Sequence, residues 1–133
     1  IKLAKEIDAD LICMTDPDGD RVGLACKNKD GKYVLLTGNE SAAILLDYIL
    51  SEKRKKGFLV NNGVVYNTVV TSTLGKEIAS SYGVSTESFL TGFKYIGDRI
   101  QYYEEHGGPE FVFGYEESYG CLIKPFVSYI IIL

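Results

Sequence analysis

Apolar residues from Phe58 onward alternate between the spacing of strands and the spacing of helices. Strands are expected within residues 58–70, at 84–90 and at 110–113, with helices between them at 73–82 and 92–106. A helix between two strands allows those strands to run parallel, with helices covering both faces of the sheet. This order predicts the fold class α/β: a three-layer α/β/α domain with a mixed, mostly parallel sheet, preceded by a partial domain.

A helix that begins near residue 37 marks the start of this α/β/α unit. Thr37 and Glu40 have the spacing of a capping box, and Gly57 ends the helix. Its apolar residues recur at helical intervals along one face: Ala42, Leu45, Leu46, Ile49 and Leu50. The helix at 73–82 is expected to bury three residues in the same way: Leu74, Ile78 and Ala79. We therefore expect a domain boundary between residues 1–36 and residues 37–133.

The first 36 residues show a different pattern. They predict the second half of a helix, then a buried strand at 11–14, then a hairpin of strands at 22–26 and 33–36. Cys13 and Cys26 lie in these apolar runs and are interpreted as small buried side chains without a chemical role.

Charge and composition exclude several classes of function. The net charge of −4 gives no basic face of the kind that nucleic-acid binding requires. No apolar run approaches the roughly 20 residues that span a bilayer, so no membrane partner is expected. Three cysteines without a CxxC pair favour a reducing cytoplasm. The chain begins at Ile1 and ends in the apolar run 128–133, and neither end has the polar character of a natural terminus. We therefore interpret the chain as an excised fragment.

Three aspartates follow the predicted strand at 11–14. Asp16, Asp18 and Asp20 stand at alternate positions of a loop that contains Gly19. Carboxylate oxygens are the ligands that Mg²⁺ prefers, so the loop predicts a magnesium site, although an aspartate-rich surface turn has the same composition. Arg21 directly follows the loop. Its guanidinium could hold phosphate or sugar oxygens near the cation, or form an ion pair with one of the aspartates.

Calcium binding by an EF-hand fails on spacing. If Asp16 is the first loop position, Arg21 stands where glycine is needed and Lys27 stands where the bidentate glutamate should be.

The motif TGFK at 91–94 stands at a strand-to-helix junction. Backbone N–H groups at Gly92 and the ammonium of Lys94 could face an anion there. The same sequence is also typical of a plain helix start followed by a lysine that faces solvent.

The motif GYEESYG at 114–120 follows the last predicted strand. It places carboxylates and a hydroxyl, including those of Glu116 and Ser118, in a loop bounded by glycines. Such groups can accept from and donate to the vicinal diol of a sugar. Glycoside hydrolysis fits less well, because adjacent acidic side chains tend to diverge. Sugar binding is therefore the predicted role of this loop.

Taken in order, DPDGDR, TGFK and GYEESYG resemble the motifs of the α-D-phosphohexomutases, the phosphoglucomutase and phosphomannomutase family, and the resemblance covers about residues 1–127. In that family four domains surround one active site. The resemblance implies that residues 1–36 end the second domain and that 37–133 form the third. It also implies a role for each motif residue: Asp16, Asp18 and Asp20 as Mg²⁺ ligands, Arg21 as a catalytic residue beside them, and Glu116, Ser118, Lys94 and Gly92 as contacts of the hexose phosphate.

The implied activity is the interconversion of hexose 1-phosphate and hexose 6-phosphate through a phosphoserine and a bisphosphate intermediate. No serine of this chain lies in the family's phosphoserine context, so we expect the isolated chain to be inactive and to need the remaining domains of a parent enzyme. A stand-alone module that binds a sugar phosphate or a metal is the alternative. The apolar residues 128–133 depart from the family, which continues there with charged residues.

Overall fold

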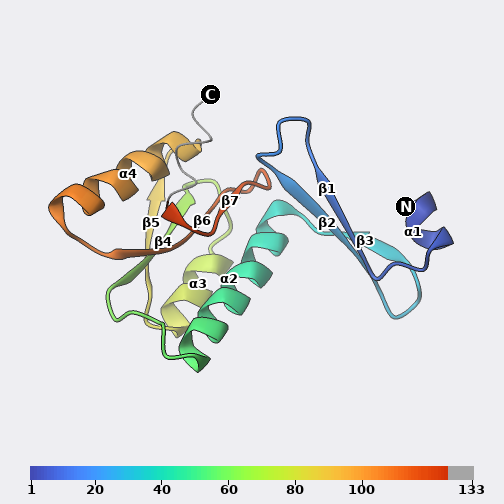
Figure 1. The fold of residues 1–133 in the computed structure, drawn as a ribbon, viewed down its shortest axis with the longest axis horizontal. Helices are drawn as coiled ribbons and strands as arrows, with labels where there is room; N and C mark the ends of the chain where they lie inside the picture. Colours follow the sequence, from blue (N-terminus) through green and yellow to red (C-terminus); the bar gives the residue numbers. More distant parts are fainter. Residues whose placement is uncertain (126–133) are drawn as a thin grey trace.

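The computed structural model describes residues 1–125. Its elements follow in the order α1 (Lys2–Glu6), β1 (Leu11–Thr15), β2 (Val22–Lys27), β3 (Tyr33–Leu35), α2 (Gly38–Lys55), β4 (Gly63–Thr68), α3 (Leu74–Ser81), β5 (Ser85–Phe89), α4 (Phe93–His106), β6 (Glu110–Tyr115) and β7 (Cys121–Leu122) (Figure 1). The apolar residues 128–133, at which the sequence departs from the pattern of the resembled family, lie outside the described residues. Among the helices of residues 1–125, none is both long and apolar enough to cross a membrane.

The strands form two sheets. The first is antiparallel, with the order β1-β2-β3. The second has the order β5-β4-β6-β7, in which β4 runs parallel to β5 and β6 while β7 runs antiparallel to β6. The predicted mixed, mostly parallel sheet is therefore confirmed.

Helices cover both faces of the second sheet. Figure 1 shows α2 and α3 together on one side and α4 on the other. On the first side, Leu46 and Leu50 of α2 pack with Val65 of β4 in one buried cluster. On the second side, Ile96 and Ile100 of α4 belong to another buried cluster. Full burial of one leucine contributes about 1.5–3 kcal/mol, so these clusters hold the three predicted layers together.

The predicted capping box of α2 is present. The Thr37 hydroxyl oxygen accepts a hydrogen bond from the Glu40 amide at 3.3 Å, and the Glu40 carboxylate accepts one from the Thr37 amide at 2.8 Å. These bonds satisfy amides at the start of the helix that have no partner within it. The basic residues 53–55 occupy the last turn, where cations suit the negative end of the helix dipole.

Two predictions of burial were wrong. The strand β1 is exposed, with Leu11 at 51% and Met14 at 47% of their full accessibility, and Cys13 is exposed as well. β1 is the edge of a sheet over which no described element forms a second layer, so its apolar side chains face solvent. Leu74 is also half-exposed, because it is the first residue of α3 and precedes the turn that packs against α2.

Candidate functional site

The three aspartates of the predicted metal loop lie close together. The loop connects β1 to β2, and the paired residues Thr15 and Val22 hold its two ends. One carboxylate oxygen from each of Asp16, Asp18 and Asp20 lies within 4.8 Å of the others. Three hard oxygen donors at this separation fit the preference of Mg²⁺ for carboxylate ligands.

Gly19 gives the metal loop its turn. Its φ of +73° lies in the left-handed region, which glycine enters without steric cost. The Gly19 amide donates to the Asp16 carbonyl at 3.2 Å, so the chain reverses between the first and last aspartates.

Arg21 pairs with the aspartates. Its amide donates to Oδ1 of Asp16 at 3.2 Å, and its Nε lies 3.8 Å from a carboxylate oxygen of Asp16 and of Asp20. The ion-pair interpretation of Arg21 is thus realised in this structure. The Arg21 side chain is still 57% exposed, so part of the guanidinium remains open to a further anion.

The pKa values of the aspartates respond to their crowding. For Asp16, partial desolvation works to raise the pKa, but hydrogen bonds from the Arg21 amide and from the neighbouring aspartates outweigh it and lower the pKa. The pKa of Asp20 is raised, first by its hydrogen bond with Asp16 and then by desolvation and the negative charges nearby. Carboxylates that disturb one another in this way are a setting in which a cation would relieve repulsion.

Glu116 joins two of the predicted motifs. It follows the end of β6, is only 8% exposed, and accepts a hydrogen bond from the Gly92 amide at 2.7 Å through Oε1. Its Oε2 accepts a hydrogen bond from the Ser118 hydroxyl at 3.2 Å. Gly92 has a φ of +122°, a conformation that side chains rarely adopt, so glycine is needed at this contact. The structure therefore brings Glu116, Ser118 and Gly92 together.

Lys94 lies apart from these contacts, in the first turn of α4. Its side chain is exposed, and its Nζ lies 5.7 Å from the centroid of the Tyr95 ring. This position matches the interpretation of a lysine that faces solvent at a helix start. The Gly92 amide, which could have faced an anion, instead donates to Glu116.

Sequence reasoning missed two residues that anchor the loop 114–120. The hydroxyl of Thr68, at the end of β4, donates to Oε2 of Glu117 at 2.8 Å. Thr68 is almost fully buried, so this bond fixes Glu117 to the sheet. Glu117 stands beside Glu116 in the motif, which was a usable signal. Nothing in the sequence marked Thr68 beyond its position at a strand end.

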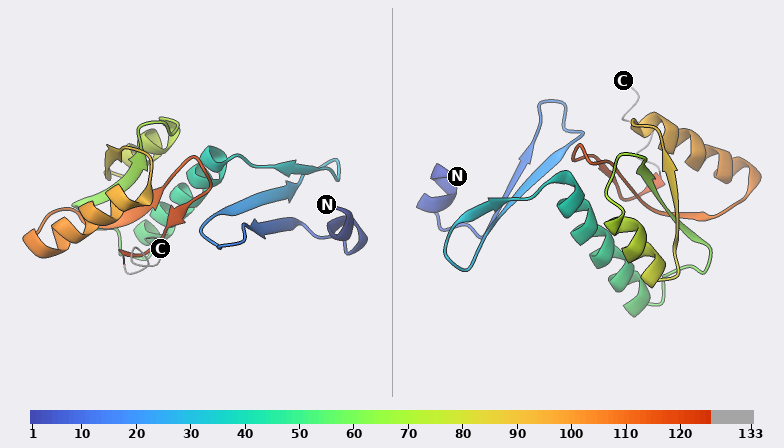
Figure 2. Two further views of the ribbon diagram at one scale, coloured as in Figure 1. Left: turned by 90° about the horizontal axis from the view of Figure 1, so that it is seen from above. Right: turned by 180° about the vertical axis from the view of Figure 1, so that it is seen from behind.

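A further missed contact joins the metal loop to the loop 114–120. The amide of Val22, which directly follows Arg21, donates to the carbonyl oxygen of Tyr119 at 3.2 Å. In Figures 1 and 2 the β1–β2 loop and the β6–β7 loop lie side by side. The loop 114–120 therefore contacts both other motifs, and the three motifs meet where the three-stranded sheet adjoins the α/β/α layers (Figure 1).

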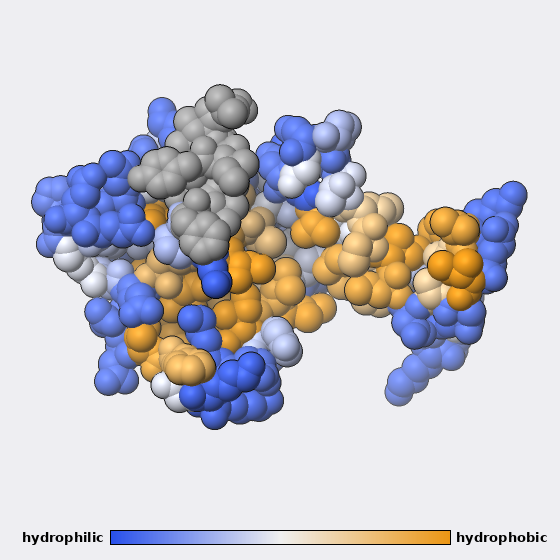
Figure 3. Space-filling model, in the orientation of Figure 1, coloured by the Kyte–Doolittle hydropathy of each residue, from blue (hydrophilic) through white to orange (hydrophobic). Residues whose placement is uncertain are grey.

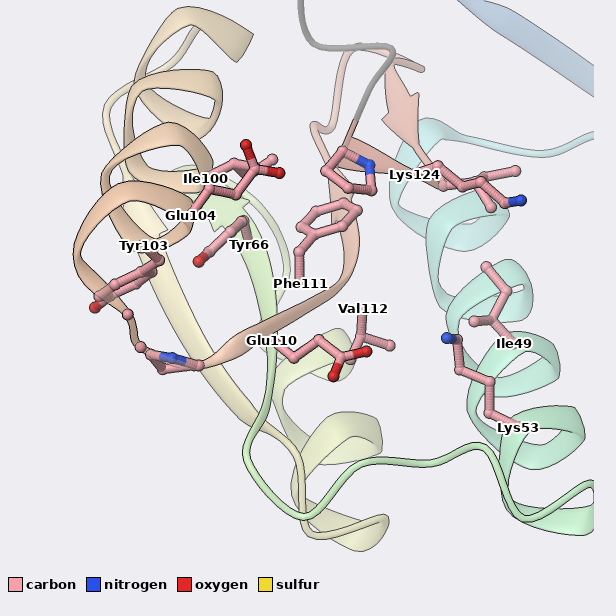
Figure 4. A pocket seen from close by; sticks show the side chains of 15 residues that line it. Ile49, Lys53, Tyr66, Ile100, Tyr103, Glu104, Glu110, Phe111, Val112 and Lys124 are labelled. Carbon is pink, nitrogen blue, oxygen red and sulfur yellow. The ribbon is translucent and has the colours of Figure 1, made fainter.

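A cavity of about 500 Å³ lies away from these motifs, between α4, β6 and α2 (Figure 4). Tyr66 and Phe111 line it, with ring centroids 5.8 Å apart. None of the predicted site residues lines this cavity. The candidate site is thus the surface where the three loops meet, and Asp18, Asp20 and Arg21 are exposed there, while Lys94 is exposed in the first turn of α4.

Comparison with known proteins points to one family. The family model described as "Phosphoglucomutase/phosphomannomutase, alpha/beta/alpha domain III" matches residues 37–129. A phosphoglucomutase from Staphylococcus epidermidis is 42% identical over 129 residues, which are 96% of this chain and 22% of that protein. A phosphoglucomutase from Staphylococcus aureus is 35% identical over 127 residues, with the same coverage. The chain thus spans about a fifth of the length of these relatives.

Solved structures share the fold. A phosphoglucomutase/phosphomannomutase family protein from Burkholderia thailandensis aligns with a TM-score of 0.66 and 20% identity, over 94% of this chain and 24% of its own. An N-acetylphosphoglucosamine mutase from Aspergillus fumigatus, solved in complex with GlcNAc-6P and magnesium, aligns with a TM-score of 0.62 and 18% identity, over 92% of this chain and 26% of its own.

Proposed function

Because this chain belongs to the phosphoglucomutase/phosphomannomutase family, we propose that it supplies the magnesium-binding and sugar-binding loops of a larger phosphohexomutase. That enzyme would interconvert hexose 1-phosphate and hexose 6-phosphate through a phosphoserine and a bisphosphate intermediate. The phosphoserine would come from a part of the enzyme outside this sequence, so the isolated chain would not catalyse the reaction.

The observation that carries this proposal is the meeting of three motifs that are far apart in the sequence. The Gly92 amide bonds to Glu116, and the Val22 amide bonds to the Tyr119 carbonyl. Both contacts lie at the carboxyl end of the parallel strands, which is where α/β sheets bind ligands. A phosphorylated sugar carries a phosphate, which can bind beside a metal ion, and hydroxyls, which can bind carboxylates and hydroxyls. A metal loop beside a sugar-binding loop therefore suits such a ligand.

Each motif would have its own task. Asp16, Asp18 and Asp20 would hold Mg²⁺, which supplies positive charge against the charge of a transferring phosphoryl group. The exposed part of the Arg21 guanidinium would bind a phosphate oxygen beside them.

The sugar would be held on the other side of the Val22–Tyr119 contact. Glu116 and Ser118 would bind sugar hydroxyls, with the Glu116 carboxylate already oriented by the Gly92 amide. Lys94 is exposed and could turn toward a substrate phosphate, since its long side chain is not held by a short contact.

The rest of the enzyme would cover surfaces that this chain leaves open. Figure 3 shows hydrophobic residues along the three-stranded sheet. Its exposed apolar residues include Leu11 and Val34, which are both paired with Cys26 and so lie on the same face. Exposed apolar groups that cluster in this way mark interaction sites in soluble proteins. We propose that residues 1–36 complete a second domain with other parts of the parent, and that residues 37–133 form the α/β/α domain. A cytoplasmic location is part of the proposal, since the cysteines among residues 1–125 are free thiols.

A chimera tests the proposed function. Residues 1–125 would replace the matching segment of the Staphylococcus epidermidis phosphoglucomutase, and the conversion of glucose 1-phosphate to glucose 6-phosphate would be measured. We expect activity in the chimera and none in the isolated chain. A chimera that is folded by circular dichroism but inactive would contradict the proposal.

Calorimetry of the isolated chain separates the alternative, a stand-alone binding module. Mg²⁺ and glucose 1-phosphate would be titrated into the chain. A site completed by other domains predicts weak or absent binding of glucose 1-phosphate, whereas tight binding would favour the stand-alone module.

A further inference from the structure

We propose that Tyr119 is a positioning residue whose backbone links the metal loop (residues 16–21) to the sugar loop (residues 114–120). The orientation of Glu116 would then depend on the Val22–Tyr119 hydrogen bond. This inference rests on the proposed function for the naming of the two loops. It concerns a backbone contact that makes no use of the tyrosine side chain.

The amide of Val22 is free to make this bond because of the register of β2. In an antiparallel pair, alternate residues direct their backbone groups toward the partner strand. The Lys27 amide donates to Asp10 on the β1 side, whereas the Leu24 carbonyl accepts from Leu36 on the β3 side. Val22 lies two residues before Leu24 and therefore points away from β1 as well. β3 is too short to reach it, and the Tyr119 carbonyl takes the place of a strand partner.

Tyr119 adopts a conformation that needs support. Its φ of +75° lies in the left-handed region, which is uncommon for any residue other than glycine. Such a conformation persists only where the surroundings hold it. The bond from Val22 holds the carbonyl side of Tyr119, and the bond from the Glu116 amide to the Gly120 carbonyl, at 2.9 Å, closes the loop behind it.

The first turn of α2 packs against the backbone of the loop 114–120. A Cβ added to Gly38 would collide with the Glu117 carbonyl oxygen and would lie 2.9 Å from the Tyr119 amide nitrogen. The loop backbone therefore rests directly on the helix and has little room to move in that direction. If the Val22 bond is lost, the open direction is away from β2, and Ser118 and Glu116 would follow Tyr119.

An amide-to-ester substitution at Val22 tests the link in the chain itself. It replaces the N–H donor with an oxygen and keeps the valine side chain. The matched control is the same substitution at Asn28, whose amide donates to the Lys32 carbonyl at 2.8 Å within the hairpin turn. Both variants lose one backbone hydrogen bond, but only the first lies between the loops.

The readout is amide hydrogen exchange by NMR at Gly92 and Glu116. The Gly92 amide donates to the Glu116 carboxylate and the Glu116 amide donates to the Gly120 carbonyl, so both amides report on the sugar loop. We expect the Val22 ester to speed exchange at both amides about 5-fold, the change that one lost hydrogen bond produces. The Asn28 ester should leave them unchanged. Unchanged exchange in a folded Val22 ester, or equal acceleration in both esters, would overturn the proposal.

A second pair of variants decides the matter if the ester does not fold. Tyr119→Val disfavours a positive φ, while Tyr119→Asn tolerates it and keeps the carbonyl. We expect faster exchange at Gly92 and Glu116 in the valine variant only, and the same rates in both variants would overturn the proposal. The activity of the chimera keeps the proposed function separate: a folded but inactive chimera would contradict the proposed function, while the exchange rates still judge Tyr119.

Discussion

The amide nitrogen of Gly92 lies 2.7 Å from Oε1 of Glu116, and this bond joins two loops that are 24 residues apart in the sequence. The carboxylate is nearly buried, and its second oxygen accepts from the Ser118 hydroxyl. A buried carboxylate is stable only when hydrogen bonds replace its lost water. Glu116 is therefore held in one orientation by the protein before any ligand is bound.

Replacing Glu116 by Gln should weaken this anchor. The amide side chain keeps the shape and one acceptor oxygen but loses the charge, and hydrogen bonds to charged groups are the stronger kind. We expect the free energy of unfolding in urea to fall by about 1 kcal/mol. The control is Glu104→Gln, an exposed residue near the end of α4, which should change stability by less than about 0.5 kcal/mol. Equal stability of the two variants would show that the Gly92–Glu116 bond contributes nothing.

The capping box predicts a dependence on pH. Hydrogen bonds from the Thr37 amide and hydroxyl lower the pKa of Glu40 below its ordinary value of 4.5. Because the pKa is lower in the folded state, the contribution to stability is complete above pH 4.5 and disappears as the pH falls through the folded value. Denaturant midpoints of the wild type and Glu40→Gln should thus differ at pH 7 and draw together as the pH falls below 4.5. A difference that stays constant over this range would contradict the assignment.

Local signals explain why much of the fold could be predicted from sequence. The start of α2 depends on Thr37 and Glu40, which lie within one helical turn of each other. The parallel core of the second sheet follows from the alternation of strands and helices, which the chain repeats with little interruption. Gly92 and Glu116 lay within recognisable motifs, so their involvement was expected even though their mutual bond was not.

The failures have a different physical origin. Burial of β1 depends on what packs over it, and the apolar run that contains Leu11 cannot reveal that no described layer does so. β7 is a strand of two residues, too short to show a periodicity. The Val22–Tyr119 contact is made between backbone atoms, which every residue carries. The contact is accompanied by the positive φ of Tyr119, a backbone angle that a tyrosine in the sequence does not predict.

Tyr66→Phe should stabilise the chain. The Tyr66 hydroxyl is buried and has no hydrogen-bond partner among residues 1–125, and burial raises the pKa of Tyr66, so the group stays neutral. A buried polar group without a partner costs about 1–3 kcal/mol, and phenylalanine removes it while keeping the ring contacts. We expect the free energy of unfolding to rise by about 1 kcal/mol. A loss of stability would instead reveal a partner for the hydroxyl.

Asp18→Ala should abolish most of the activity of the chimera without releasing its substrate. Asp18 is an exposed member of the aspartate cluster, so its removal should leave the fold intact while taking one of three oxygen donors from the proposed magnesium site. A metal ion supplies several kcal/mol of charge stabilisation in phosphoryl transfer, so we expect turnover to fall about 100-fold or more. Binding of glucose 1-phosphate, measured by calorimetry, should change far less, because the proposed sugar contacts are Glu116 and Ser118.

The matched control for this prediction is Asp30→Ala, which removes an exposed aspartate from the turn between β2 and β3, outside the aspartate cluster. Its turnover should equal that of the unmodified chimera, since only the local charge changes. Excess Mg²⁺ should restore part of the activity of Asp18→Ala, because a weakened site can still be filled by mass action. Near-normal turnover of Asp18→Ala at low Mg²⁺ would remove the metal role from this loop, and loss of glucose 1-phosphate binding would instead assign Asp18 to the substrate.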